Sequence, residues 1–193
     1  MSPIDPRDLV LVRHAPTETG GRLCGRRDVP AWLDDAGAIA RLATALESCA
    51  CVVASPARRC LQTAEALFPG RVSDADPRLW GQDFGEQEGL ETAALPDPGP
   101  LDRGALARQA PPGGESFADM VARAAPALID LAETASGTGP VAVVAHAGRV
   151  RAGLELALGS VPAALAFGVA ALSLTRLRRA GDGWSISLVD GHP

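Results

Sequence analysis

The sequence "DLVLVRHAPTETGGRLCGRRDVP", residues 8–30, decides how the rest of the chain is interpreted. Its apolar run, Leu9–Val12, ends abruptly in Arg13 and His14, and a loop rich in glycine and arginine follows. A continuous apolar run of this kind is typical of a strand that is buried on both faces of a sheet. A cation and an imidazole at its carboxyl end therefore predict a polar site at that edge of the sheet.

The composition is that of an ordinary globular domain, with 193 residues, 47% of them hydrophobic and 21% charged. This length predicts one domain over residues 1–193. The net charge of −5 gives no indication of a partner that is a nucleic acid or a membrane. All 18 basic residues are arginine, so any cationic site uses the planar guanidinium group, which suits phosphate.

The cysteines and one uncharged stretch bear on where the protein is located. The four cysteines lack the spacing of zinc-binding pairs, and we interpret them as small core residues in a reducing cytoplasm. The acidic N-terminal segment is unlike a signal peptide. Residues 156–175 carry no charge, but Gly159, Pro162 and Gly168 interrupt them. We therefore expect a helix end, a turn, a short helix and a strand there, rather than a membrane span.

Short apolar runs alternate with helical patterns along the chain, which predicts a central, mostly parallel sheet with helices on both faces. Strands are predicted at residues 9–14, 51–55 and 141–146, and helices at residues 36–48, 57–68, 114–135 and 148–159. Residues 172–179 and 184–190 are typical of a terminal hairpin, with Gly181-Asp182-Gly183 as its turn. Residues 92–113, rich in proline and glycine, are predicted to leave the sheet as a candidate lid.

Polar side chains gather at the predicted carboxyl ends of three strands. These residues are Arg13 and His14, then Ser55 with Arg58 and Arg59 just beyond, and then His146 with Gly148 just beyond. One histidine in such a place is more often an incidental polar residue than a catalyst. Two histidines accompanied by arginines favour a site for an oxyanion, because clustered cations are costly without an anion.

A phosphoryl group fits this arrangement. An unprotonated histidine nitrogen can attack phosphorus, while arginines and a second histidine hold the oxygens as their charge redistributes. The carboxylates are not clustered as they are in magnesium or two-metal sites, so we expect neither a metal nor another cofactor.

Five segments occur in the order "LVRHAPTE", "SPARRCLQTAEAL", "DFGEQEG", "PGGES" and "VVAHAG". Together they resemble the histidine phosphatase superfamily, over nearly the whole chain. The resemblance implies a three-layer, phosphoglycerate mutase-like α/β fold. It also implies a phosphorylated nucleophile at His14, a second phosphate-binding histidine at His146, phosphate-binding arginines at Arg13 and Arg59, and substrate contacts at Thr17 and Gly148.

The chain departs from the family pattern in "RLWGQDFGEQEG". The pattern Leu-x-Glu-x-x-Phe-Gly carries a glutamate that commonly donates a proton to the leaving alcohol, and the aligned residue here is Gly81. Asp83 and Glu115 are candidates to replace it. The alternatives are that Asp83 caps backbone N–H groups and that Glu115 is a helix N-terminal carboxylate. A Gly81→Glu replacement is expected to raise the rate on alkyl phosphates more than on aryl phosphates.

The resemblance predicts a phosphomonoesterase that acts on a small phosphate monoester through phospho-His14. Within the superfamily, "GRLCGRRDVP" and the short chain are most similar to alpha-ribazole phosphatases, which remove a 5′-phosphate from a nucleoside-like substrate. The loss of the glutamate leaves a second hypothesis, a catalytically impaired protein that binds a phosphate ligand. A phosphoglycerate mutase is less expected, because mutases usually keep the glutamate and a longer insertion.

Overall fold

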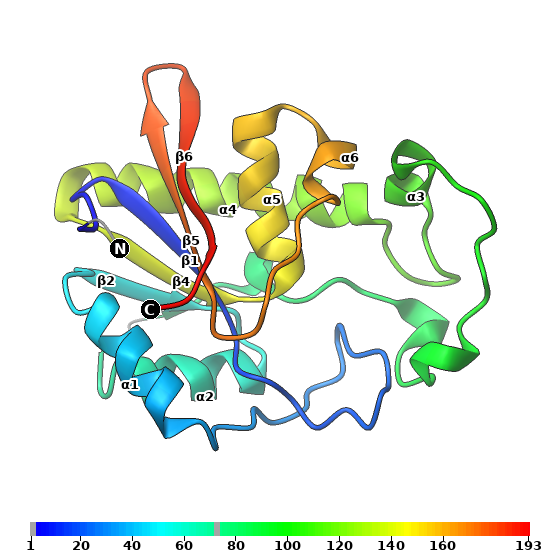
Figure 1. Cartoon of the computed structure of the whole chain (residues 1–193). Helices are drawn as coiled ribbons and strands as arrows, with labels where there is room; N and C mark the ends of the chain where they lie inside the picture. The colour runs from blue at the N-terminus through cyan, green and yellow to red at the C-terminus, as the bar shows by residue number, and fades with distance from the viewer. Residues whose placement is uncertain (1–2, 72–73) are drawn as a thin grey trace.

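The computed structural model describes residues 3–71 and 74–193, and these form one sheet between two layers of helices (Figure 1). The strands are β1 (Asp8–Arg13), β2 (Cys51–Ala54), β3 (Asp74–Ala75), β4 (Val141–Ala145), β5 (Leu174–Ala180) and β6 (Gly183–Gly191). The α-helices are α1 (Ala36–Ala45), α2 (Arg58–Leu67), α3 (Arg103–Arg108), α4 (Phe117–Thr138), α5 (Ala147–Leu158) and α6 (Val161–Ala164). The predicted three-layer α/β architecture is confirmed.

The strand order within the described sheet is β3-β2-β4-β1-β5-β6. β1 pairs in parallel with β4, β4 with β2, and β2 with β3. β5 runs antiparallel to β1, and β6 runs antiparallel to β5. The sheet is therefore mostly parallel, as predicted, and the carboxyl ends of β1, β2 and β4 share one edge.

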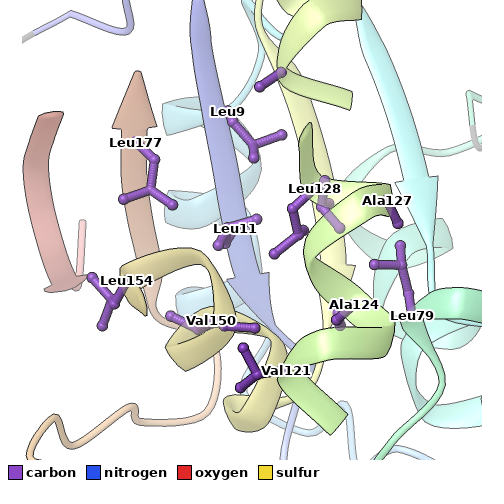
Figure 2. Close-up of a cluster of buried hydrophobic side chains, with 14 of the residues drawn as sticks. Leu9, Leu11, Leu79, Val121, Ala124, Ala127, Leu128, Val150, Leu154 and Leu177 are labelled. Carbon is purple, nitrogen blue, oxygen red and sulfur yellow. The ribbon is translucent and has the colours of Figure 1, made fainter. Parts of the chain in front are cut away.

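The two faces of the sheet bury alternate residues of the same strands. Leu9 and Leu11 of β1 belong to the core cluster that α4 and α5 cover, and Figure 2 shows them with Leu128 of α4. Val10 and Val12 belong to the cluster on the other face, under α1 and α2. Because the side chains of a strand alternate between faces, this two-sided burial accounts for the continuous apolar run in β1.

The long helix predicted at residues 114–135 is present, but it lies at Phe117–Thr138. The Oγ atom of Ser116 accepts a hydrogen bond from the N–H of Asp119, whose carboxylate accepts one from the N–H of Ser116. This capping box satisfies two free donors and fixes the start of the helix. At the other end Gly139 adopts a φ of 110°, which a residue with a side chain rarely does.

The uncharged stretch at residues 156–175 divides as predicted into the end of α5, the short helix α6, a loop and the start of β5. No helix in the described part of the chain is long and apolar enough to cross a membrane. The hairpin of β5 and β6 is also confirmed, and its turn contains Gly181 with a φ of 60°.

Residues 92–113 leave the sheet and carry α3, the helix at the far right of Figure 1. The segment lies beyond the edge where β1 and β4 end. Its role as a lid stays a prediction.

One buried ion pair lies at the opposite end of β1 from the histidine. The carboxylate of Asp8 is 1% exposed and pairs with Arg178 of β5 at 2.9 Å. The neighbouring Arg179 pairs at 2.7 Å with Glu133, and both side chains are largely in solvent. We expect Arg178→Gln to lower the free energy of unfolding by about 2–4 kcal/mol, because it leaves a buried carboxylate without its cation.

The matched control is Arg179→Gln, which should change the free energy of unfolding by less than about 1 kcal/mol, since an exposed pair contributes little. Urea denaturation of both variants measures the difference. Equal losses in the two variants would contradict this account of Asp8.

Candidate active site

The side chain of His14 lies at the end of β1 and is 8% exposed. Its backbone N–H donates to the carbonyl of Ala145 at 2.9 Å, which extends the pairing of β1 with β4 by one residue. Its Nδ1 lies 2.7 Å from the carbonyl oxygen of Ala15. A carbonyl oxygen only accepts, so Nδ1 carries the hydrogen and Nε2 of the neutral ring is unprotonated.

His146 follows β4 in the same way and is also 8% exposed. Its Nδ1 lies 3.2 Å from a guanidinium nitrogen of Arg59, and its Nε2 lies 2.9 Å from the hydroxyl of Ser55. Because a guanidinium only donates, Nδ1 is the acceptor and Nε2–H donates to Ser55. The His14 and His146 ring centroids are 5.3 Å apart, so the structure brings together the two histidines selected from the sequence.

Burial keeps both imidazoles neutral. It lowers the pKa of His14 to about 4, and the positive charges of Arg59 and Arg13 act in the same direction. It also lowers the pKa of His146 well below its ordinary value, with His14 and the nearby arginines adding to the effect. A neutral His14 has a nitrogen lone pair available at physiological pH.

Arg59 is buried behind His146, whereas Arg58 is exposed. Its guanidinium donates to the carbonyl oxygens of Arg27 at 2.9 Å and Gly25 at 2.8 Å. These bonds tie α2 to the glycine- and arginine-rich loop that opens the sequence. Arg59 therefore contacts His146 but is not among the residues that line the cavity beside the two histidines, and its role in binding phosphate stays a prediction.

A cavity of about 210 Å³ opens at this edge of the sheet. It is lined by Arg13, His14, Cys24, Gly25, Gly81, Gln82, Phe84, Phe117, His146, Ala147, Gly148, Arg149 and Arg151. Thr17 is not among these residues, and its backbone instead pairs with that of Ala31. Two larger cavities near the C-terminus contain neither histidine at a strand end, so chemistry rather than size identifies the candidate site.

Sequence reasoning missed two arginines of α5, Arg149 and Arg151, which line the cavity. The guanidinium of Arg149 is buried and donates to the carbonyl of Trp80, and burial lowers its pKa to about 9. The Nε atom of Arg151 donates to the carbonyl of Phe167 at 2.9 Å. The segment "GRVR", which follows His146 and Ala147, carried the signal, because it places two cations in the first turns of the helix.

Positive charge is concentrated around this cavity without a counterion. Three guanidinium groups and two imidazoles line it, and the lining residues, all within the described chain, include no carboxylate. Burial lowers the pKa of Arg13, and repulsion from Arg151 adds to the shift. The first N–H groups of α5 also face this edge, since the helix begins at Ala147. An oxyanion with several acceptor oxygens is the ligand that this arrangement stabilises.

Asp83 and Glu115 do not line the cavity. Oδ1 of Asp83 accepts from the N–H of Gly85 at 2.9 Å. Glu115 accepts from the N–H of Asp83 at 3.0 Å and pairs with the guanidinium of Arg123. The contact of Asp83 matches the alternative of a carboxylate that caps backbone N–H groups, whereas Glu115 precedes the N-cap of α4 and binds a loop N–H and Arg123 rather than helix N–H groups. Their use as proton donors stays a prediction.

The loop at residues 25–27 is held by the carboxylate of Glu88. Its side chain accepts hydrogen bonds from the N–H groups of Gly25, Arg26, Arg27 and Phe84. These four hydrogen bonds hold the backbone of the loop whose carbonyl oxygens accept from Arg59.

Gly81 lies against this loop, and the contact limits which side chains fit at this position. A Cβ atom at Gly81 would lie 2.5 Å from the carbonyl oxygen of Gly25, the same oxygen that accepts from Arg59. A Gly81→Glu replacement therefore has to displace the loop before its carboxylate can act. The expected effect of this replacement on the rates stays a prediction, with a shift of the loop as its added requirement.

Within the described residues, no three His, Cys, Asp or Glu side chains form a group that could hold a metal ion. The expectation of chemistry without a metal stays a prediction.

Comparisons with known proteins agree with this site. The family model described as "Histidine phosphatase superfamily (branch 1)" matches residues 9–190. A glucosyl-3-phosphoglycerate phosphatase of Mycolicibacterium vanbaalenii is 34% identical over 173 residues, which cover 81% of this chain and 76% of the relative. A solved mycobacterial glucosyl-3-phosphoglycerate phosphatase, in complex with VO3, has a TM-score of 0.82 and 29% identity, covering 96% of this chain and 99% of that one.

The alpha-ribazole phosphatase of Shigella flexneri has a TM-score of 0.81 at 19% identity, with 95% of this chain and 96% of that chain covered. Identity at this level supports the shared fold alone.

The buried neutral histidines predict how stability depends on pH. The pKa of His14 falls from 6.5 to about 4 on folding, so between these values the unfolded chain binds more protons. The contribution of His14 to the free energy of unfolding is therefore fully present above pH 6.5 and is lost as the pH falls toward 4. In phosphate-free buffer, the loss of unfolding free energy between pH 7 and pH 5 should be about 1–2 kcal/mol smaller in His14→Gln than in the wild type.

Urea denaturation at the two pH values measures this difference. The control is His192→Gln, which removes a histidine that is exposed in the C-terminal tail and should keep the wild-type dependence. The same slope in His14→Gln and the wild type would show that His14 is not a buried neutral group.

The contact of Gly81 with Gly25 predicts the effect of one methyl group. Gly81→Ala should lower the free energy of unfolding by about 1–3 kcal/mol, because its Cβ displaces the loop. It should also weaken the binding of inorganic phosphate, since Arg59 loses the carbonyl of Gly25. Denaturation and calorimetric titration with phosphate measure the two effects.

The matched control is Gly137→Ala in α4, where a Cβ meets nothing within 4 Å and the helix gains up to about 1 kcal/mol. A Gly81→Ala protein with wild-type stability and phosphate affinity would mean that the loop moves at no cost.

Proposed function

Because this chain belongs to the histidine phosphatase superfamily (branch 1), we propose that it hydrolyses a small phosphate monoester through a phosphohistidine on His14. The observation that carries the proposal is the bond of Nδ1 to the carbonyl of Ala15. It leaves Nε2 of His14 unprotonated in a cavity whose other charged groups are cations.

The proposed reaction has two steps. In the first, Nε2 of His14 attacks phosphorus while the bond from phosphorus to the ester oxygen breaks, and the leaving oxygen takes the electron pair. In the second, water attacks phosphorus, the bond to Nε2 breaks, and phosphate leaves with the histidine restored. Arg13, which lines the cavity, would hold the phosphoryl oxygens in both steps, as positioned cations do for transferred phosphoryl groups. Arg59 and His146 would join it by exchanging a present hydrogen bond, to Gly25 or Arg27 and to Ser55 respectively, for one to a phosphoryl oxygen.

The named relatives support a phosphatase, and their complexes support an anion site. One solved neighbour is described with VO3 and another, at 28% identity, with inorganic phosphate. Glucosyl-3-phosphoglycerate is the substrate in the relatives' names, which makes this ester one compound to assay. Alpha-ribazole 5′-phosphate is a second one, supported only by the shared fold.

The small phosphate ester is the only partner that we propose. All four cysteines are free thiols, and burial raises the pKa of the Cys60 thiol to about 12. Four thiols without a disulfide support the proposed location in a reducing cytoplasm.

A second candidate is a phosphate-binding protein with impaired catalysis. The observation that favours it is Gly81, which stands where the family pattern carries a glutamate. General acid help is worth about a hundred- to ten-thousand-fold in rate, so its loss slows substrates with poor leaving groups most.

Trapping of the phosphoenzyme separates these two candidates. With a radiolabelled aryl phosphate, the wild type should form a protein phosphate that is stable to base and labile to acid, as a phosphohistidine is. His14→Gln should lose this label completely, and His192→Gln should keep it. Peptide mapping should place the phosphate on His14.

Phosphate binding without a label and without turnover would favour the impaired binding protein. A label that survives in His14→Gln would assign the nucleophile to another residue.

A further inference from the structure

A second cavity adjoins the one that contains the two histidines. It has a volume of about 530 Å³ and lies under the excursion at residues 92–113. Four residues line both cavities, namely Gln82, Phe84, Phe117 and Arg151. A group bonded to a phosphate beside His14 would therefore extend into the second cavity, which we call the leaving-group cleft.

The leaving-group cleft is mainly apolar. Its lining residues are Gln82, Phe84, Gln87, Leu95, Pro96, Pro98, Leu106, Gln109, Ala110, Pro111, Pro112, Phe117, Arg151 and Leu165. The polar ones are three glutamines and one arginine, and the Nε atom of that arginine already donates to the carbonyl of Phe167. Prolines add apolar surface without a backbone N–H to donate.

This lining suits a ring system better than a sugar. Each hydroxyl that enters an apolar cleft without a partner costs about 1–3 kcal/mol, so a group with many hydroxyls binds poorly there. A flat apolar ring gains binding energy from contact with Phe84, Phe117 and the proline wall. Arg151 is the one cation in the lining of the cleft, so a leaving group with several anionic groups finds a single charged partner there.

A separate observation concerns how the leaving oxygen is protonated when the ester bond breaks. Neither cavity is lined by an aspartate or glutamate in the described chain, so no carboxylic acid stands ready to protonate the leaving oxygen. The backbone of Gly25 fills the space beside Gly81 where the side chain of the usual glutamate would begin. A leaving group that is stable as an anion does not require this proton.

We propose that the substrate is an aryl phosphate, in which the ester oxygen is bonded directly to an apolar ring that occupies the leaving-group cleft. The inference rests on the proposed phosphohistidine mechanism and names its substrate class. The bond from phosphorus to the phenolic oxygen breaks as His14 attacks, the aryloxide leaves with the electron pair, and solvent protonates it. Water then cleaves the bond from phosphorus to nitrogen.

Two matched pairs of substrates test the two observations separately. Phenyl and benzyl phosphate carry similar rings, but the phenol leaves far more readily as an anion than benzyl alcohol does. Without a general acid, kcat should be at least about a hundredfold higher for the phenyl ester. Phenyl and 2-naphthyl phosphate have leaving groups of similar acidity, and the larger ring should lower KM by about tenfold through burial in the cleft.

A variant of the cleft wall provides the structural test. Leu106 lies on α3 in the cleft wall and is 43% exposed, so Leu106→Gln should fold normally. It should reduce the advantage of the naphthyl over the phenyl ester by about threefold or more. The matched control is Leu158→Gln at the end of α5, a residue that is 40% exposed and does not line the cleft, and it should keep the wild-type ratio.

Glycerol 3-phosphate, 3-phosphoglycerate and glucosyl-3-phosphoglycerate complete the panel. If one of these is hydrolysed with a kcat/KM equal to or above that of 2-naphthyl phosphate, the aryl phosphate proposal is overturned while the phosphohistidine mechanism stands. If no ester labels His14, the proposed function itself fails. Equal KM values for the phenyl and naphthyl esters would remove the leaving-group cleft from the proposal.

Discussion

The parallel pairing of β1 with β4 is the constraint on which the rest of the structure depends. Its register places Arg13 opposite Ala145, so the next residue of each strand is a histidine. The backbone hydrogen bond from His14 to Ala145 continues this register past the strands and holds the rings at 5.3 Å. Apolar side chains on both faces fix the pairing, because a slip by one residue would turn each buried side chain to the opposite face.

This edge of the sheet collects positive charge that the fold does not neutralise. Arg59 contacts His146 from α2, Arg13 ends β1, and Arg149 and Arg151 extend from α5. Part of the guanidinium donor capacity is used on backbone carbonyls, including those of Gly25 and Trp80, which holds these side chains in place without cancelling their charge. Burial of cations in this way lowers the free energy of unfolding, and a bound oxyanion raises it again. Such a site is organised for its ligand before the ligand arrives.

At the same edge of the sheet, this chain matches the superfamily pattern at some residues and departs from it at one. His14, His146 and two arginines follow the pattern of the superfamily, whereas the glutamate position does not. The carbonyl oxygen of Gly25 lies 2.5 Å from the point where a Cβ at Gly81 would be. The apolar cleft beyond it belongs to the excursion at residues 92–113 and to neighbouring loops. The lining of the cavity beside His14 and the lining of the apolar cleft therefore come largely from different parts of the chain.

The sequence by itself determined the architecture and the histidine pair. Continuous apolar runs ending in Arg13-His14 and in His146 require a sheet buried on both faces with polar residues at one edge, and helical periodicity supplies the covering layers. The capping box that starts α4 at Phe117 is also a local pattern, since its two residues are three positions apart. The prediction did not use it and placed the start of the helix at residue 114. Local patterns are sufficient here because strand burial and helix capping depend on residues that are close in sequence.

The groups that complete the site were identified from contacts in the folded chain. The tertiary structure showed that Arg149 and Arg151 reach the cavity and that Asp83 and Glu115 are engaged elsewhere. The tautomer of His14 depends on a neighbouring carbonyl, and the space beside Gly81 depends on a loop that Glu88 holds from a distant part of the chain. These features arise from contacts between segments far apart in sequence, and the packing of the whole fold, rather than any local pattern, brings those segments together.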